Sequence, residues 1–408
     1  MLRATVAPLG PTVSSRGVFD VTAYGADPTA TQDSTDAIQS AVRAAMNSAT
    51  HRTMGTVLFP SGSYSISRTI NVTRSAAGDS SGVVLLGSGV AEITQQCFGC
   101  DVFFGAQLWR FTARQLWLRG GRHQLHVGNG NTNQGFFLVD DVQFENSSGV
   151  AINIIEGTPS TKLVVRDCKF NGCDQVLVNR CDWSTMETSW IEASCDTGAK
   201  GVIENHNHLF LRDILGVPCN RDHAAHRPTP TRWIDNFGAP SIGGGYLHVR
   251  NFRFGGEMGG FLPVANFAAY LCHEVFTPSG GEQCGKVNRS GAPLPPRMRS
   301  SGGASIVLEG CSFAGSYGHA HAAEVYLVEI PGQLVVRDSW FEVERDNASY
   351  AVVGLDPAID LDGPYLANPI ASASTIRIEI AANNWGLRPQ QRALPAQLGP
   401  FVVSSGGS

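Results

Sequence analysis

Apolar and polar residues follow an eight-residue pattern that recurs nine times along this chain. The pattern reads apolar, any, apolar, any, Asp or Asn, any, any, aromatic, and its first and third positions have the two-residue period of a β-strand. Successive starts are 28, 26, 20, 26, 38, 59, 28 and 44 residues apart. Recurrence of this kind indicates a solenoid in which each repeat contributes one coil. Clear copies begin at Phe137, Leu163, Leu209, Leu247, Ile306 and Leu334, and weaker copies begin at Trp109, Trp183 and Ile378.

The fifth position of the repeat predicts a corner between two strands. Asp and Asn make tight bends by hydrogen-bonding their own backbone or by adopting a left-handed conformation. After the corner the sixth and eighth positions point inward again, and third strands are predicted at residues 149–155 and 174–179. The sequence therefore predicts an all-β fold, a three-sided parallel β-helix. The corner residues are Asp141, Asp167, Asp213, Asn251 and Asp338, for which calcium binding is the alternative role.

Three long intervals between copies predict loops that leave the coil. These inserts, at 217–244, 256–302 and 342–375, lack strand period and are rich in Gly and Pro. Function in solenoids concentrates on such excursions, so we expect the active site between the coil and the inserts at 216 to 303. The coil itself is predicted over 81–390, with an extension at 1–17, a cap and first strands at 18–80, and a tail at 391–408.

Outward positions of the repeat carry two further signals. The fourth position includes Arg166, Arg212, Arg250 and Arg337, a stripe whose guanidinium groups match the carboxylates of an anionic polysaccharide. Asp140 and Glu309 interrupt the stripe, and Met186 also falls there, so a solvated face is the alternative. The second position is apolar and also predicted to face outward, which indicates a surface covered by an insert or by a neighbouring chain. Its members are Leu138, Val164, Phe210, Val307 and Val335.

One helix is predicted near the N-terminus. Asp33 or Ser34 can cap it, and Asp36 lies in its first turn, where negative charge meets the positive end of the helix dipole. Ile38, Val42 and Ala45 lie on one face at helical spacing. An amphipathic helix across an open solenoid end would cover unpaired strand edges and exposed core. We therefore interpret the aspartates of this segment as turn and cap residues, and the helix as a cap.

The N-terminal segment resembles a known superfamily. The stretches FDVTAYGADPTATQDSTDAIQSAV, GTVLFPSGSYSIS and GVVLLGSGV are similar to the opening of the pectate-lyase-like right-handed parallel β-helix proteins. That superfamily includes polygalacturonase-like glycosidases, epimerases, polysaccharide lyases and phage tailspikes. The resemblance implies a right-handed coil, and its tailspike members imply a homotrimer. It speaks to fold more than to activity.

Candidate catalytic residues occur in several places. The resemblance to polygalacturonases implies paired aspartates, but Asp174 follows Cys173, and the inverting mechanism lacks a recognisable second carboxyl. A lyase needs a base beside a uronate carboxylate, and ENHNH offers Glu204, His206 and His208. The alternative is that these histidines have no catalytic role. Glu257 is a further acid candidate, and the alternative for it is an ordinary exposed glutamate. Another histidine pair includes His319.

Composition limits the partners. Charged residues make up 16% of the chain and its formal net charge is -5, which gives no support to nucleic-acid binding. No apolar run is long enough to cross a membrane, and no secretion signal is obvious. Of ten cysteines, Cys97 and Cys100 are interpreted as structural, Cys168 and Cys311 as core thiols, and Cys272 with Cys284 as a disulfide candidate.

Together these features predict a protein that binds an acidic polysaccharide, leaning towards an enzyme that cleaves it as a lyase or a glycoside hydrolase. The alternative is a tailspike or another virion surface protein that recognises a host glycan, with or without catalysis; a purely structural, adhesin-like coil is a third option. The missing secretion signal favours the alternative, because virion parts are released by lysis. Either way we expect a cell-surface glycan or polysaccharide as partner, an extracellular or virion-surface location and no certain cofactor.

Overall fold

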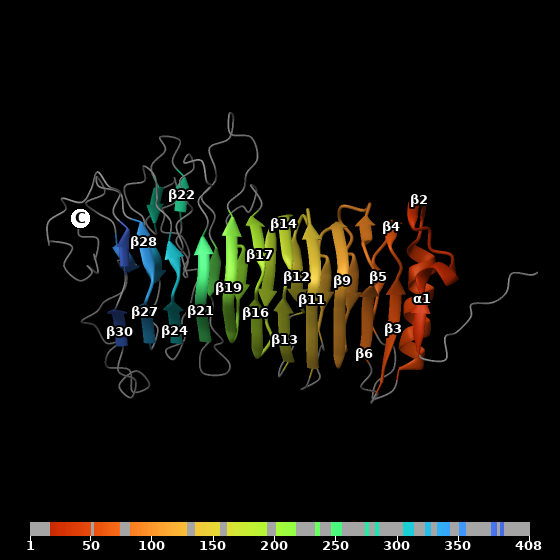
Figure 1. The fold of residues 1–408 in the computed structure, drawn as a ribbon, viewed down its shortest axis with the longest axis horizontal. Helices are drawn as coiled ribbons and strands as arrows, with labels where there is room; N and C mark the ends of the chain where they lie inside the picture. The colour runs from red at the N-terminus through yellow and green to blue at the C-terminus, as the bar shows by residue number, and fades with distance from the viewer. Residues whose placement is uncertain are drawn as a thin grey trace, which may run out of the picture.

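The computed structural model describes residues 17–49, 53–73, 82–128, 135–155, 161–193, 201–217, 233–236 and 246–254. Beyond them it describes shorter stretches at 274–276, 282–284, 305–313, 323–327, 333–342, 351–355, 377–381 and 384–386. These residues form a right-handed parallel β-helix whose coils follow one another along a single long axis (Figure 1). The predicted fold is confirmed.

Two of the three faces belong to one twenty-stranded sheet that bends around a corner. Four long strands pass through the corner and contribute to both faces: β9 (Arg110–Gly120), β11 (Gly135–Glu145), β19 (Leu209–Val217) and β21 (Tyr246–Phe254). The rest of the first face consists of β1 (Val18–Asp20), β3 (Met54–Phe59), β6 (Gly82–Gly87), β13 (Thr161–Arg166), β16 (Trp183–Glu187), β24 (Ser305–Glu309), β27 (Gln333–Arg337) and β30 (Arg377–Ala381). The rest of the second face consists of β2 (Thr29–Asp33), β4 (Gly62–Ile66), β7 (Ala91–Gln95), β14 (Lys169–Cys173), β17 (Trp190–Ala193), β25 (Ser312–Phe313), β28 (Trp340–Glu342) and β31 (Asn384–Gly386).

The third face is a separate seven-stranded sheet of shorter strands. It consists of β5 (Ile70–Asn71), β8 (Phe103–Gly105), β10 (Leu125–Val127), β12 (Val150–Ile154), β15 (Gln175–Asn179), β18 (Ile203–Asn205) and β20 (Ile234–Asn236). β20 lies within the segment predicted as the first insert. Two small pairs complete the described strands: β22 (Glu274–Phe276) with antiparallel β23 (Glu282–Cys284), and β26 (Ala323–Leu327) with parallel β29 (Ala351–Leu355).

The corner between the first and second faces is formed as the repeat predicts. All five predicted Asp and Asn residues have left-handed backbone, with φ between 51° and 54°. Gln115 and Thr188 occupy the same corner with φ of 52° and 46°. Side chains also bond along the corner, since Asn251 Nδ2 donates to Asp213 Oδ1 at 2.8 Å. A short polar side chain therefore serves both the bend and the stacking of coils.

The core runs along the axis in columns of like residues. First and third positions such as Phe137, Val139, Leu209 and Leu211 are buried, as predicted. Cys168 and Cys311 are buried core thiols, and burial raises the pKa of each to about 12. Where the third face turns into the first, buried amides form a ladder, in which Asn179 Nδ2 donates to Asn205 Oδ1 and Asn205 Nδ2 donates to Asn236 Oδ1.

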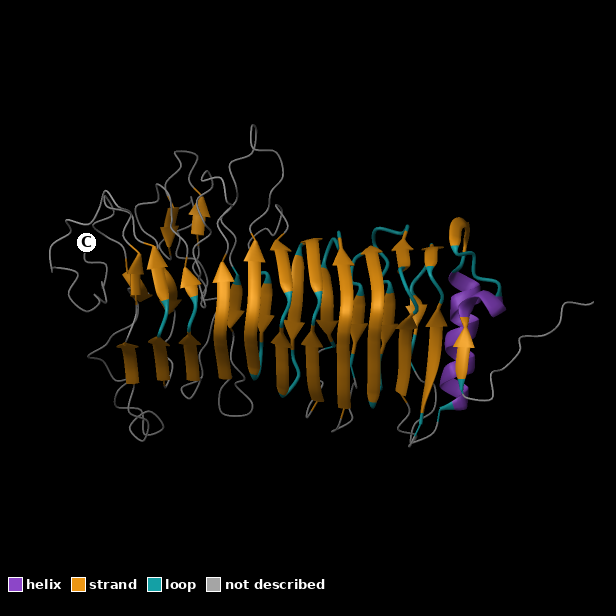
Figure 2. Ribbon diagram, in the orientation of Figure 1, coloured by secondary structure: helices purple, strands orange, loops and turns teal. Residues whose placement is uncertain are grey.

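The predicted cap is present as α1 (Thr35–Ser48), which lies across the N-terminal end of the coil (Figure 2). A short 3₁₀ helix, η1 (Val21–Tyr24), precedes it. Asp33 Oδ1 accepts from the Thr35 amide at 3.0 Å, and Ile38 lies on the buried face of the helix. Both oxygens of Asp27 accept backbone N–H groups in the preceding turn, so this aspartate is a turn residue.

Two weak copies of the repeat were assigned the wrong register. Lys162 pairs with Trp183, which places Trp183 outward and Met186 in the buried third position rather than the exposed fourth. The copy predicted from Trp109 begins two residues later, at Phe111, because Phe111 pairs with Phe137. The second-position residues do point outward. Leu138, Val164, Phe210 and Val307 are only partly exposed, however, and Val335 is buried.

Candidate functional site

The outer surface of the third face carries a column of side chains that includes His126, Asn153 and Glu204. In β10 the middle residue, His126, points outward and lies between Phe104 of β8 and Asn153 of β12 in the parallel register. The residues on either side of His126, Leu125 and Val127, are buried. A strand of three residues thus fixes one imidazole on the surface of a rigid sheet, which is a favourable support for chemistry.

Asp101, just before β8, is the buried centre of a group beneath His126. It is only 4% exposed. His126 Nδ1 lies 2.8 Å from Asp101 Oδ2, and Arg122 Nε donates to Asp101 Oδ1 at 3.0 Å. Burial alone would raise the pKa of Asp101, but the hydrogen bonds from His126 and Arg122 outweigh it and lower that pKa to about 2. Asp101 is therefore a carboxylate at neutral pH.

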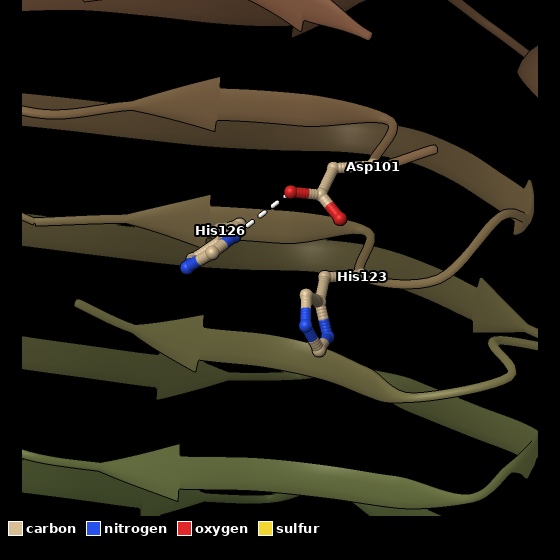
Figure 3. A group of neighbouring side chains, drawn as sticks. All are labelled: Asp101, His123 and His126. Carbon is tan, nitrogen blue, oxygen red and sulfur yellow. Dashed lines mark hydrogen bonds and ion pairs between the residues drawn. The ribbon is translucent and has the colours of Figure 1, made fainter. Parts of the chain in front are cut away.

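His123 completes the group as a neutral donor. Its Nδ1 accepts a hydrogen bond from the Val150 amide at 3.0 Å, so the ring proton is on Nε2. Burial lowers the pKa of His123 to about 4, against the attraction of Asp101. The rings of His123 and His126 lie 4.9 Å apart at 73°, and Figure 3 shows both beside Asp101.

The arrangement assigns a role to each side chain. With its Nδ1 proton donated to Asp101, His126 keeps a lone pair on Nε2, which is the state of a general base. Arg122 is about half exposed. It uses two of its five N–H donors on Asp101, at 3.0 and 3.3 Å, so its charge can also serve an anionic ligand.

A metal ion fits this group poorly. One ligand atom from each of Asp101, His123 and His126 lies within 4.8 Å of the others. However, both oxygens of Asp101 are bonded to Arg122 and His126, and Nδ1 of His123 is bonded to the backbone. A cation would have to displace the Arg122 guanidinium and reverse the His123 tautomer. The donor set favours acid–base chemistry.

The turn before Asp101 is held in several ways. Cys97 and Cys100 form a disulfide three residues apart. The predicted Cys272–Cys284 disulfide stays a prediction, because Cys272 lies outside the described residues. The Asp101 amide donates to Thr69 Oγ1, and the Asp101 carbonyl accepts from Gln95 Nε2 at 2.8 Å. These contacts fix the carboxylate on which the position of His126 depends.

A second carboxylate–imidazole pair lies on the same face. Glu204 of β18 shares the outward column with His126, three coils further along, which is about 14 Å at about 4.8 Å per coil. Glu204 Oε1 is 2.5 Å from His206 Nε2, and Gln175 Nε2 bonds the other oxygen at 3.4 Å. Burial would raise the pKa of Glu204, but the bond from His206 and its charge lower it.

Comparison with known proteins agrees with this architecture. Residues 18–99 match the family model described as rhamnogalacturonase A/epimerase, pectate lyase-like. The match covers the cap and the first coils, and the described residues continue the same coil from there. The match and the described coil fit the pectate-lyase-like β-helix superfamily.

Solved structures similar to this chain include two enzymes and a viral protein. The A-module of mannuronan C-5 epimerase AlgE6 from Azotobacter vinelandii is 16% identical with a TM-score of 0.43, over 91% of this chain and 98% of that one. The catalytic unit of a GH87 α-1,3-glucanase from Streptomyces thermodiastaticus is 13% identical with a TM-score of 0.41, over 92% and 69%. ORF18 of Geobacillus virus E2 is 13% identical with a TM-score of 0.42, over 91% and 59%. The comparison with curated proteins found no match.

The predicted arginine stripe of this pectate-lyase-like coil is a ladder of ion pairs. The arginines do share one outward column of the first face, but carboxylates alternate with them. Arg250 is exposed between Arg212 and Glu309 in the same column. An anionic glycan would compete with these carboxylates, so substrate binding by the column stays a prediction. The pairs are Arg166 with Asp140 (Nε to Oδ1, 2.8 Å), Arg212 with Glu187, and Arg337 with Glu309 (Nη2 to Oε1, 3.2 Å).

The other predicted site residues are dispersed over the coil. His208 is separated from Glu204 and His206, because β18 ends at Asn205 and His208 lies at the start of the first face. Asp174 precedes β15 on the third face, where its amide donates to Ser147. Glu257 and His319 lie outside the described residues.

Sequence reasoning missed the Asp101 group of this coil entirely. Two signals were present in the sequence: His123 and His126 are three residues apart, and Asp101 stands two residues before an apolar pair, Phe103 and Phe104. The chemistry was sought near the inserts, whereas the group lies on regular coils closer to the N-terminal cap.

Proposed function

We propose that this chain acts on an acidic polysaccharide by removing the proton next to a uronate carboxylate, with His126 as the general base. The observation that carries the proposal is the bond between buried Asp101 and His126 Nδ1, which leaves Nε2 of His126 free to accept that proton. The superfamily match supports a carbohydrate substrate, because the matching family is described as rhamnogalacturonase and epimerase.

The neighbouring side chains suit this reaction. Arg122 would pair with the uronate carboxylate and lower the cost of forming a carbanion beside it. The neutral His123 would donate its Nε2 proton in a hydrogen bond to a carboxylate oxygen as negative charge develops there. In a lyase the C–H electron pair forms a carbon–carbon double bond, and the glycosidic oxygen departs with the electron pair of its bond to carbon and takes a proton from water. The hydroxide left by that water takes the abstracted proton from His126, which restores the base.

Hydrolase chemistry is less well supported by the same face. A hydrolase needs two carboxyl groups about 5 to 9.5 Å apart. In the Asp101 group, Asp101 is the single carboxylate, and the next one considered, Glu204, lies four coils away, about 19 Å at about 4.8 Å per coil. Asp235 is in register with Glu204 on the next coil, so a carboxylate pair would lie there and not at His126. We therefore favour lyase chemistry, with Glu204 and His206 as groups that contact the polymer further along the face.

The test is product analysis on a panel of uronate-containing and bacterial surface polysaccharides. A lyase raises both ultraviolet absorbance from unsaturated uronate and the number of reducing ends. We expect His126→Gln to lower kcat by about 10² to 10⁴, the range for loss of a general base. His206→Gln is the matched control and should act mainly on KM. Reducing ends without the absorbance, or a His126→Gln variant at the wild-type rate, would overturn the proposal.

A further inference from the structure

A cluster of aromatic rings lies on the outer surface of the first face, around the corner from Glu204 and His206. It is formed by Trp183 of β16, His208, Phe210 of β19 and Tyr246 of β21, called here the aromatic platform. Ring centroids are 4.7 Å apart for Trp183 and Phe210 and 5.2 Å for Phe210 and Tyr246. The platform therefore spans three neighbouring coils as one connected surface.

The fold does not require aromatic residues at these positions. Trp183, His208 and Tyr246 share one outward column, and Trp183 is 49% exposed. In the column of Trp183 the preceding coil carries the polar Lys162. In the column of Phe210 the preceding coil carries Thr185, and most other coils carry aliphatic side chains, such as Val164 and Val307, rather than aromatic ones. The inward residues of these strands already supply the core. Rings held on the surface where polar or aliphatic side chains satisfy the fold indicate a ligand.

Polar contacts hold the turn from the third face into the first face, next to the platform. His208 Nδ1 lies 2.8 Å from Asn207 Oδ1, and Asn207 Nδ2 donates to Asp182 Oδ1 at 3.0 Å. Asn207 is itself buried. Its amide therefore fixes the ring of His208 parallel to Trp183 within 15°, at 6.0 Å between centroids. A preorganised surface of this kind loses little entropy when it binds.

The chemistry of the platform fits sugar rings without charge. Trp, Tyr and His offer an apolar body and a polar edge, which matches the C–H face and hydroxyl rim of a pyranose. Beside the platform Arg212 forms an ion pair with Glu187, and His248 Nε2 lies 3.5 Å from Glu309 Oε2.

The size of the platform argues against a protein partner. Three coils at about 4.8 Å each, by the width of two outward columns, give a surface on the order of 150 Å². A stable protein–protein interface needs about 800 Å² from each partner. A short stretch of sugar rings is within the area available.

We propose that the aromatic platform is a binding site for neutral hexose units of a glycan, separate from the acid–base group at Asp101. This proposal concerns glycan binding only, so it does not depend on the chemistry proposed for His126. A glycan held here would reach the Glu204 side of the third face, since Glu204 and His208 are only four residues apart in the chain.

Calorimetric titration with cellohexaose, laminarihexaose and maltohexaose tests the platform. We expect saturable binding of at least one, weakened about two- to tenfold by Trp183→Ala, the loss given by removing one aromatic contact. Trp183→Phe should retain most of the affinity. Trp190→Ala is the matched control, since Trp190 is 44% exposed on the second face beneath Lys169. His126→Gln should bind like the wild type whether or not it is inactive.

Several outcomes would overturn the proposal. These are no binding of any of the three hexasaccharides, unchanged affinity in Trp183→Ala, or an equal loss in Trp190→Ala. Light scattering can give one more such outcome. If the wild type is an oligomer and Trp183→Ala has the 43.5 kDa mass of a single chain, the platform is a contact between copies of the chain. If Trp183→Ala fails to fold by circular dichroism, Tyr246→Ala carries the same expectation.

Discussion

Acid should destabilise this protein by protonating His123, and His123→Gln should remove that part of its acid sensitivity. Burial lowers the pKa of His123 from 6.5 to about 4. Between these values the unfolded chain binds a proton that the folded chain does not, so the free energy of unfolding falls as the pH falls. The contribution is fully present above pH 6.5 and lost by pH 4, and the difference in pKa corresponds to about 3 kcal/mol.

Glutamine is the appropriate replacement because its side-chain oxygen can accept the Val150 N–H that His123 Nδ1 accepts. The variant thus lacks the titrating imidazole but still pairs the Val150 N–H. Urea unfolding, followed by tryptophan fluorescence at fixed pH values between 7.5 and 4, measures the effect. The wild type should lose about 3 kcal/mol more than His123→Gln across this range. Thr185→Ser, a non-titrating change on the first face, should keep the wild-type slope, and parallel curves for the wild type and His123→Gln would refute the reasoning.

Two further predictions concern stability. Asp101→Asn should lower the free energy of unfolding at pH 7 by about 2 kcal/mol. This value follows from the pKa of Asp101, which its partners lower from 3.8 to about 2. Because that pKa is lowered, the difference from the wild type should vanish as the pH falls from about 4 to 2, and a constant difference would contradict the assignment. Asp167→Val should cost about 1 to 2 kcal/mol, since a β-branched residue resists the left-handed corner at φ 53°. Asp167→Asn should cost little, and equal losses in the two variants, measured by urea unfolding, would contradict the corner argument.

The fold could be predicted because its determinants are local. A corner residue such as Asp141 or Asp213 needs only a side chain that tolerates the left-handed conformation, and an inward residue needs only the strand period. Register failed at Trp183 because WSTMETSW has apolar residues at positions 183, 186 and 190, so its period fits more than one alignment. Pairing with Lys162 decides the matter, and that pairing depends on a coil twenty-one residues away.

The site could not be predicted by the same means. Asp101, His123 and His126 come from two neighbouring coils, and their contact depends on the stacking of β8 on β10. Both strands are three residues long, too short to show the alternation that identified the other faces. Their chemistry also depends on quantities that no pattern contains, namely the burial of Asp101 and the bond from the Val150 amide to His123.

The geometry of the coil favours a polymer as ligand. A small molecule binds in a concave site that buries most of its surface. The groups identified on this chain instead lie on outward columns, in which each coil adds one side chain about 4.8 Å from the last. His126 and Glu204 are three coils apart on the third face, and Trp183 lies around the corner on the first. A small sugar can reach only one of these groups and would bind weakly. A polysaccharide can contact several of them at once, so their contributions to its affinity add.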